Sequence, residues 1–185
     1  HEVDDHLFLR NRIPIDCGDV AYGIRWLFAR IARLPALVTT EENRLFGHWS
    51  SLFDHLPTAG NWYRDRRFLA SLEYVLQNTS TRTLAEDSYP IRIAPDALFP
   101  GTIFLYDGHA GMVSTLVTDG STFSPIKTWE ATLPRKVSTL IPRDFLAMDG
   151  DPSLGTGILR FRWPIEAGGR WRYLGDENHP YYSME

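Results

Sequence analysis

The chain of 185 residues contains a single cysteine, Cys17. One cysteine excludes an internal disulfide, and it excludes a zinc site built from several cysteines. No apolar run approaches the roughly 20 residues that a bilayer-spanning helix needs, and no internal repeat or low-complexity linker is present. The sequence therefore predicts no membrane span, and Cys17 needs an explanation of its own.

Neither sign of charge is in large excess. The 19 basic and 23 acidic residues give a formal net charge of -4, and the pI is about 5.9. This balance offers no broad attraction for phosphates, so we expect no nucleic-acid partner. The apolar share of 43% is that of an ordinary globular protein, and the length suits one domain with one core, residues 1–185.

The first regular pattern follows Cys17. After an extended approach at 12–15, apolar residues recur at steps of four and three until Pro35, which indicates a helix that begins at or just after Cys17. Thr39 and Glu42 fit a capping box, and the apolar spacing that follows predicts a second helix up to Pro57. A third apolar stripe over 68–76 ends at 78–80 and predicts a third helix, so we expect residues 39–78 to be helical.

From about Tyr89 the chain changes to short β-rich runs between Pro and Gly residues. These predicted strands cover 91–93, 102–106, 111–117, 122–129, 137–141 and 157–163. Residues 164–185 are expected to form an irregular, aromatic-rich tail. Helices first and strands afterwards predict an α+β domain, with the helices packed on one side of an antiparallel sheet.

Cys17 stands where free backbone N–H groups and the helix dipole stabilise a thiolate, which is the position expected of a nucleophile. The charges of Asp16 and Asp19 work against that effect, so an imidazolium neighbour would be needed. The alternative is that Cys17 is a small buried apolar residue.

His109 follows a predicted strand and a tight turn at Asp107-Gly108, and it opens the next strand. Its small neighbours leave the imidazole accessible, which suits a general base. The alternative is a structural histidine.

The two segments together resemble the NlpC-type cysteine peptidase superfamily, which has a papain-like fold. Asp16-Cys17-Gly18 is similar to the superfamily's cysteine motif at a helix start, with Gly18 in place of the usual Ser and Asp19 in place of the usual Gly. Pro100-Gly101 followed by 108–111 is similar to its histidine motif, with Thr102 in place of the common Asp. The resemblance covers the first helix and residues 100–145, and it implies Cys17 as nucleophile and His109 as base. It also implies that the helical residues 39–78 are an insertion between the cysteine helix and the histidine strand.

The third member of the site is predicted from strand register. If Asp119-Gly120 is a two-residue hairpin turn, Glu130 lies directly across from His109 and can orient the imidazole. A bulge, for which Pro125 is a candidate cause, would bring Thr128 or Ser124 near His109 instead. The alternative for Glu130 is a solvated charge at a strand end.

The resemblance implies a cysteine hydrolase that cleaves an amide bond, with a peptide or bacterial cell-wall peptide as substrate. It also implies a periplasmic or secreted location, although the first residues of this chain do not read as a signal peptide. Neither a cofactor nor a metal ion is expected, and a calcium loop at 149–153 is rejected because Leu154 stands where the turn glycine is required. An acyl-transfer enzyme with the same residues and an inactive module that binds a glycan or a protein are the alternatives.

Overall fold

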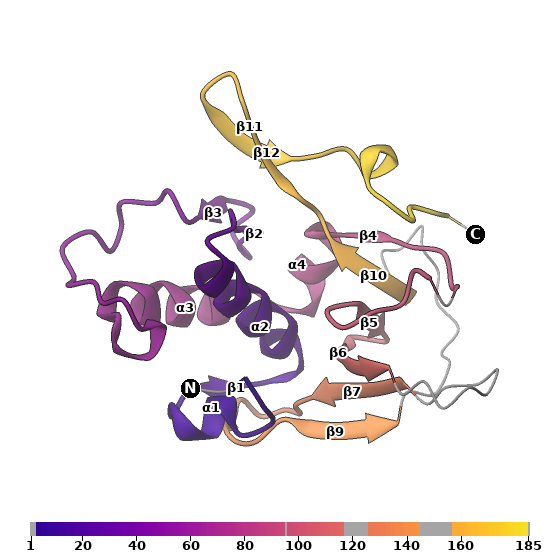
Figure 1. The fold of residues 1–185 in the computed structure, drawn as a ribbon, viewed down its shortest axis with the longest axis horizontal. Coiled ribbons are helices and arrows are strands. Elements are labelled where there is room, and N and C mark those ends of the chain that lie inside the picture. Colours follow the sequence, from indigo (N-terminus) through magenta and orange to yellow (C-terminus); the bar gives the residue numbers. More distant parts are fainter. Residues whose placement is uncertain (1–2, 95, 117–125, 145–156, 185) are drawn as a thin grey trace.

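The computed structural model describes residues 3–94, 96–116, 126–144 and 157–184, which form a mixed α+β fold (Figure 1). This confirms the predicted class. The helices are α1 (Leu7–Arg10), α2 (Cys17–Ala32), α3 (Arg66–Asn78) and α4 (Thr81–Glu86), with short 3-10 helices at Trp62–Arg64 and Asp176–Asn178. The strands are β1 (Pro14–Ile15), β2 (Leu37–Thr39), β3 (Leu45–Gly47), β4 (Ser88–Pro90), β5 (Ile103–Tyr106), β6 (His109–Leu116), β7 (Ile126–Glu130), β8 (Lys136–Val137), β9 (Ile141–Asp144), β10 (Gly157–Phe161), β11 (Pro164–Ala167) and β12 (Arg170–Tyr173).

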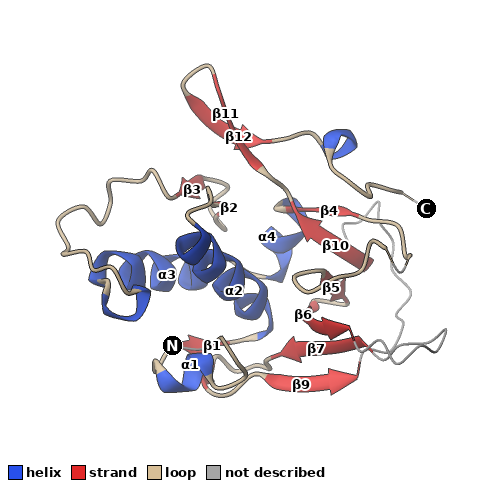
Figure 2. Ribbon diagram, viewed as in Figure 1, coloured by secondary structure: helices blue, strands red, loops and turns tan. Residues whose placement is uncertain are grey.

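Six strands form the main sheet in the order β4-β10-β5-β6-β7-β9, and all neighbours are antiparallel. Figure 2 shows α1, α2 and α3 on one side of the molecule and these strands on the other. The core lies where α2 meets β6, because Ala110 and Met112 of β6 are buried together with Val20 and Leu27 of α2. The predicted packing of helices on one side of an antiparallel sheet is confirmed.

Helix α2 begins at Cys17, as predicted. The Asp16 side chain accepts from the backbone N–H groups of Gly18 and Asp19, and the Asp19 carboxylate accepts from the N–H of Asp16, which forms a capping box. The helix ends at Ala32, its C-cap Arg33 has a left-handed φ of 56°, and Pro35 follows. The start of α2 is therefore fixed by carboxylates on both sides of Cys17.

The predicted helix over 39–57 is wrong, and within residues 39–78 the helices are the 3-10 turn Trp62–Arg64 and α3. Strands β2 and β3 form a hairpin there, closed by a turn in which the N–H of Thr40 donates to the carbonyl of Arg44. The apolar residues that fitted a helical stripe do not share a buried face, since Leu45, Trp49 and Leu52 are all exposed. Sequence spacing also missed the short helices α1 and α4.

The prediction of an irregular tail at 164–185 is wrong for residues 164–173, which form a hairpin. Strands β11 and β12 pair through a turn at Gly168-Gly169, both at positive φ, and this hairpin projects from the top of the molecule in Figure 1. Tyr173 at its end donates to the buried carboxylate of Asp87, which ties the tail to the core. Of the helices in the described ranges, none has both the length and the apolar character needed to cross a bilayer.

Candidate functional site

The Cys17 thiol lies against strand β6 at the position of His109. Its Sγ donates to the carbonyl oxygen of Gly108 at 3.9 Å, and the backbone N–H of Ala110 points at the sulfur from the other side of His109. The two candidate residues come from opposite ends of a long stretch of chain, and the packing of α2 on β6 brings them together. The thiol bonds to the backbone that flanks His109, and the imidazole itself makes no hydrogen bond to it.

The turn before β6 explains how His109 is placed. Asp107 and Gly108 both have positive φ, 47° and 73°, and Tyr106 pairs directly with His109. Two positive φ values in a two-residue loop are typical of a type I′ hairpin, so the predicted Asp-Gly turn is confirmed. The His109 side chain keeps 38% of its surface exposed, whereas Cys17 keeps 7%.

The environment of Cys17 favours the thiol. Burial raises the pKa of Cys17 above its ordinary value of 9.0, and the charge of Asp16 raises it further. The backbone N–H groups of Ala110, Gly18 and Cys17 lower the pKa, but the raising effects are larger. This agrees with the expectation that Asp16 works against the helix terminus: burial and the charge of this capping carboxylate outweigh the helix N–H groups.

The imidazole of His109 is held by Glu130. Its Nε2 lies 2.9 Å from the Glu130 carboxylate, whose side chain is only 10% exposed. A carboxylate accepts hydrogen bonds, so we assign the proton of neutral His109 to Nε2. Nδ1 is then an acceptor, and it has no hydrogen-bond partner in the part of the chain that the structure describes.

The strand register that produces this contact differs from the predicted one. Glu130 pairs with Gly111, two residues beyond His109, and a bulge lies between Val113 and Thr115. The direct pairing of Glu130 with His109 is wrong. A shift of two residues keeps both side chains on the same face of the sheet, so the carboxylate still reaches the imidazole diagonally.

Gly111 makes this diagonal contact sterically feasible. A Cβ at Gly111 would lie 2.4 Å from the Phe104 ring and 2.8 Å from Cγ of Glu130. Phe104 in turn packs beside the imidazole, with ring centroids 6.0 Å apart. Sequence reasoning used Gly111 only as part of a motif and missed this spatial role.

Two further residues hold the Glu130 carboxylate. The hydroxyl of Thr128, which is fully buried, donates to Oε1 at 3.0 Å, and Nε of Arg143 lies 3.3 Å from Oε2. Thr128 therefore contacts Glu130, and not His109 as the alternative supposed. Ser124, the other alternative, and the turn at Asp119-Gly120 lie outside the described residues. Arg143 comes from β9, and the sequence carried no signal for it because its contact depends on the pairing of β7 with β9.

Asp19 is a buried carboxylate in the first turn of α2, two residues after Cys17. It pairs with Nε of Arg135 at 3.0 Å, and its side chain is 2% exposed. Burial, with the charge of Asp16 next, raises the pKa of Asp19 to about 7, although Arg135 opposes the shift. Asp19 thus titrates near neutrality beside the start of α2.

A donor for a developing oxyanion is present at the same helix end. The backbone N–H of Cys17 is the first of α2, and it lies close enough to the Cys17 sulfur to lower the pKa of the thiol. Helix-terminal N–H groups carry partial positive charge and bind anions. The site thus brings together a thiol, an imidazole with a free acceptor nitrogen, an orienting carboxylate and a backbone donor.

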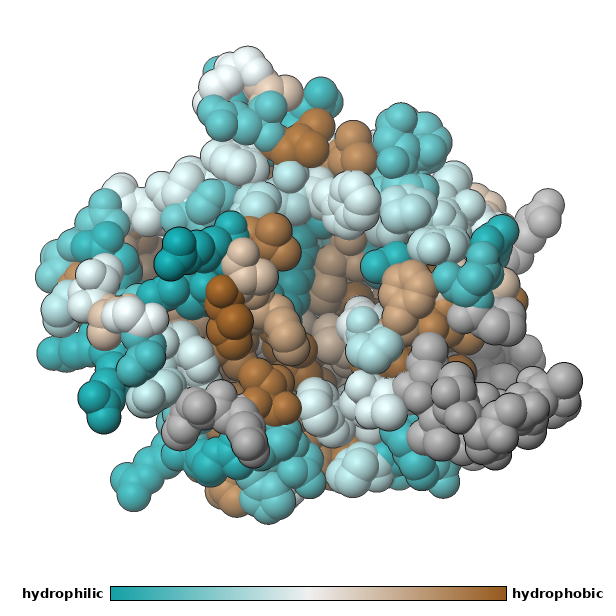
Figure 3. All heavy atoms as spheres, in the orientation of Figure 1, coloured by the Kyte–Doolittle hydropathy of each residue, from teal (hydrophilic) through white to brown (hydrophobic). Residues whose placement is uncertain are grey.

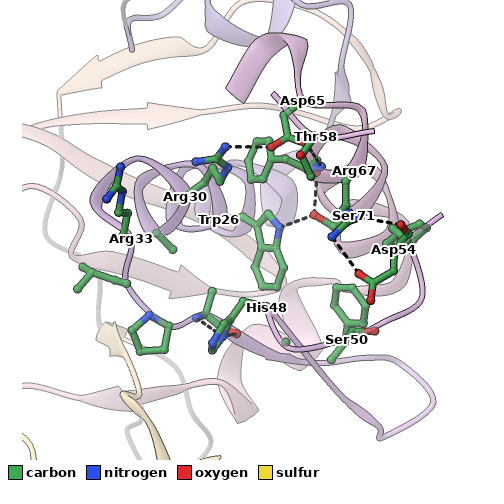
Figure 4. Close-up of a pocket in the computed structure, with 18 of the residues that line it drawn as sticks. Trp26, Arg30, Arg33, His48, Ser50, Asp54, Thr58, Asp65, Arg67 and Ser71 are labelled. Carbon is green, nitrogen blue, oxygen red and sulfur yellow. Dashed lines mark hydrogen bonds and ion pairs between the residues drawn. The ribbon is translucent and has the colours of Figure 1, made fainter. Parts of the chain in front are cut away.

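Two cavities lie along α2, and Cys17, His109 and Glu130 line neither of them. The cavity of about 750 Å³ at the carboxyl end of α2 is shown in Figure 4. There Arg30 bonds to Asp65, and the indole of Trp26 donates to Ser71. This cavity is a separate feature from the candidate site.

One group of potential metal ligands lies outside the site. Asp4, Asp5 and His6 bring ligand atoms within 4.8 Å of one another. Each carboxylate already has a local partner, since Asp4 pairs with Arg10 at 2.8 Å and Asp5 bonds to His6 at 2.8 Å. These exposed pairs account for the grouping without an ion.

Comparison with protein families, with curated proteins and with solved structures finds no match to this chain. The inference about function therefore depends on the site's geometry and on the resemblance of its motifs.

Proposed function

We propose that the protein is a cysteine hydrolase in which Cys17 attacks the carbonyl of an amide bond, His109 transfers the proton and Glu130 orients His109. The observation that carries the proposal is the contact of the Cys17 thiol with the backbone on both sides of His109, together with the 2.9 Å bond from His109 to Glu130. A nucleophile, a base and a group that holds the base are the parts that such chemistry requires.

The raised pKa of Cys17 implies that the thiol loses its proton during the attack. As Sγ bonds to the carbonyl carbon, its proton passes to Nδ1 of His109, and the Glu130 carboxylate stabilises the resulting imidazolium. The oxyanion accepts from the N–H of Cys17. His109 then gives its proton to the leaving amine as the C–N bond breaks, which leaves a thioester on Cys17. Water, deprotonated by His109, cleaves the thioester to a carboxylic acid and restores the thiol.

The resemblance to NlpC-type enzymes supports a papain-like fold, a cell-wall peptide as substrate and a periplasmic or secreted location. The exposed face of His109 is the side from which a peptide would approach. The antiparallel sheet with α2 packed on its central strand is compatible with that fold.

A digestion assay tests the proposal. Purified protein is incubated with peptidoglycan and with peptides cut from it, and the release of new amino groups is measured. We expect release by the wild type, and a loss of at least about 10³-fold for Cys17→Ala and for His109→Ala. Release by Cys17→Ala at the wild-type rate would overturn the assignment of the nucleophile.

Acyl transfer uses the same residues, and the same assay detects it. If an added primary amine appears in the product in place of water, the enzyme is a transferase, and the roles of Cys17, His109 and Glu130 stand.

The low exposure and raised pKa of Cys17 favour a second candidate, an inactive module that keeps the fold and binds a glycan or protein. Iodoacetamide separates the two. Labelling of the folded wild type that slows in His109→Ala supports the enzyme, whereas a thiol that reacts only after unfolding supports the module.

A further inference from the structure

The residues that line the second cavity along α2 suit a ligand with both an apolar part and a negative charge. It encloses about 580 Å³, within the range of roughly 300–1,000 Å³ that small-molecule sites occupy. Its walls are mainly apolar and come from α2 and from three strands of the sheet. They include Ile24, Phe28, Met112, Trp129, Phe161 and Trp163.

Every charged side chain that lines this cavity is an arginine. Arg25, Arg160 and Arg162 contribute to the lining, and no Asp or Glu does. Arg162 is neutralised by Asp176 at 2.6 Å. Within the described ranges neither Arg25 nor Arg160 forms a direct ion pair, although the charge of Arg25 also acts on the buried carboxylate of Asp87, and Arg160 lies over the Phe99 ring at 4.5 Å. The cavity is therefore positive as well as apolar, whereas Arg30 and Arg67 in the cavity of Figure 4 are each paired with an aspartate.

Arg25 carries a buried donor that lacks an acceptor. Its Nη2 donates to the carbonyl of Arg162 at 2.9 Å, and its guanidinium lies 4.1 Å from the centre of the Phe161 ring. Its Nη1 is buried and has no hydrogen-bond partner among the described residues. Buried polar atoms are nearly always paired, so an unpaired guanidinium nitrogen leaves the positive charge of Arg25 incompletely compensated. The contacts to Arg162 and Phe161 hold this guanidinium beside the cavity.

The cavity also has an apolar rim that would receive a hydrocarbon chain. Phe28 and Trp163 are each half exposed, and so is Ile31, one turn beyond Phe28. Figure 3 shows hydrophobic side chains gathered in the middle of this face, over the position of α2. A contiguous patch of exposed apolar side chains beside a cavity is typical of a ligand-binding groove.

We propose that this cavity binds an amphiphilic carboxylate, with the carboxylate beside the guanidinium groups of Arg25 and Arg160 and the hydrocarbon chain against Phe28 and Trp129. Arginine matches a carboxylate in geometry and charge, and apolar walls without an acidic group exclude a cationic ligand. None of the residues that line the cavity belongs to the candidate active site, so this inference does not depend on the hydrolase proposal.

Calorimetry with three twelve-carbon probes tests the ligand class. Dodecanoate, dodecan-1-ol and dodecyltrimethylammonium share a chain and differ in charge, and each is titrated into the wild type below its aggregation concentration. We expect one dodecanoate per chain, bound at least tenfold more tightly than either of the other probes. Equal affinity for the three probes, or no binding of dodecanoate, would overturn the proposal.

Two substitutions at one exposed wall residue locate the site. Phe28→Glu and Phe28→Lys both remove the ring, but only glutamate adds repulsion for an anion. We expect Phe28→Glu to weaken dodecanoate binding at least tenfold relative to Phe28→Lys, and Arg160→Gln to weaken it severalfold. Leu45→Glu changes an equally exposed apolar residue outside the cavity and should bind as the wild type does. Identical affinities for Phe28→Glu and Phe28→Lys would show that the carboxylate binds elsewhere.

Discussion

The carboxylate of Glu130 reaches Nε2 of His109 at 2.9 Å although Glu130 is paired across the sheet with Gly111. The contact is diagonal, and it depends on three supports: the missing side chain at Gly111, the Thr128 hydroxyl and the Arg143 guanidinium. Glu130 is thus placed before any substrate arrives. Such fixed placement is what the orientation of a general base requires.

Glu130→Gln should lower kcat by about 10²- to 10⁴-fold and leave KM nearly unchanged. The amide is similar in shape, but it does not stabilise the imidazolium, and it can present a donor to Nε2 and so favour the wrong tautomer. Amide hydrolysis measured over a range of substrate concentrations checks this split. Glu166→Gln, which changes an exposed carboxylate of β11, is the matched control. An equal effect of both substitutions would remove Glu130 from the site.

Gly111→Ala should destabilise the protein by about 1–3 kcal/mol, because the new methyl group meets the Phe104 ring and the Glu130 side chain. Urea unfolding measures the change. Gly60→Ala is the control, since a Cβ there meets no atom within 4 Å, and its free energy of unfolding should stay within about 0.5 kcal/mol of the wild type. The two alanine variants should also differ in activity, because only Gly111 lies beside Glu130. A Gly111→Ala variant as stable and active as the wild type would contradict the steric argument.

Local signals predicted the parts of the site that depend on short stretches of sequence. The capping residue Asp16 and the apolar stripe placed Cys17 at a helix start, and Asp107-Gly108 placed His109 after a tight turn. The contribution of Arg143 could not be predicted, because it needs the register of two strand pairs and a bulge.

The same limit explains the errors in the fold. The apolar spacing at 39–57 predicted a helix where the structure has a hairpin and turns. The apolar residues there recur at helical steps but do not share a buried face. The tail was assigned as irregular because its order depends on tertiary contacts. Tyr173 bonds to Asp87, and the ring of His179 accepts from the N–H of Trp163. Neither contact leaves a trace in local periodicity.

Asp16→Asn should make Cys17 reactive at lower pH. Burial is the main cause of the raised pKa of Cys17, and the neighbouring Asp16 charge adds to it. Asparagine remains a good helix cap, so the substitution removes the charge and keeps the start of α2. The rate of iodoacetamide labelling is measured from about pH 6 to pH 10, and the midpoint of the variant is expected below that of the wild type. Glu73→Gln on α3 serves as the control, and a midpoint unchanged by Asp16→Asn would rule out the charge effect.

Asp19→Asn should change how stability depends on pH. The pKa of Asp19 is raised from 3.8 to about 7, so between these values the folded protein binds a proton that the unfolded chain has released. The folded state is then favoured at low pH, and this contribution is lost as the pH rises toward 7. Asparagine has no such proton and still accepts from the N–H of Asp16. The stability of the variant relative to the wild type should rise with pH across this window, by at most about 1.4 kcal/mol per pH unit.

Urea unfolding at about pH 4.5, 5.5, 6.5 and 7.5 gives the comparison, with exposed Asp144→Asn as the control. Parallel curves for the wild type and Asp19→Asn would mean that Arg135 keeps Asp19 ionised throughout, since a carboxylate that is charged in both states contributes no slope.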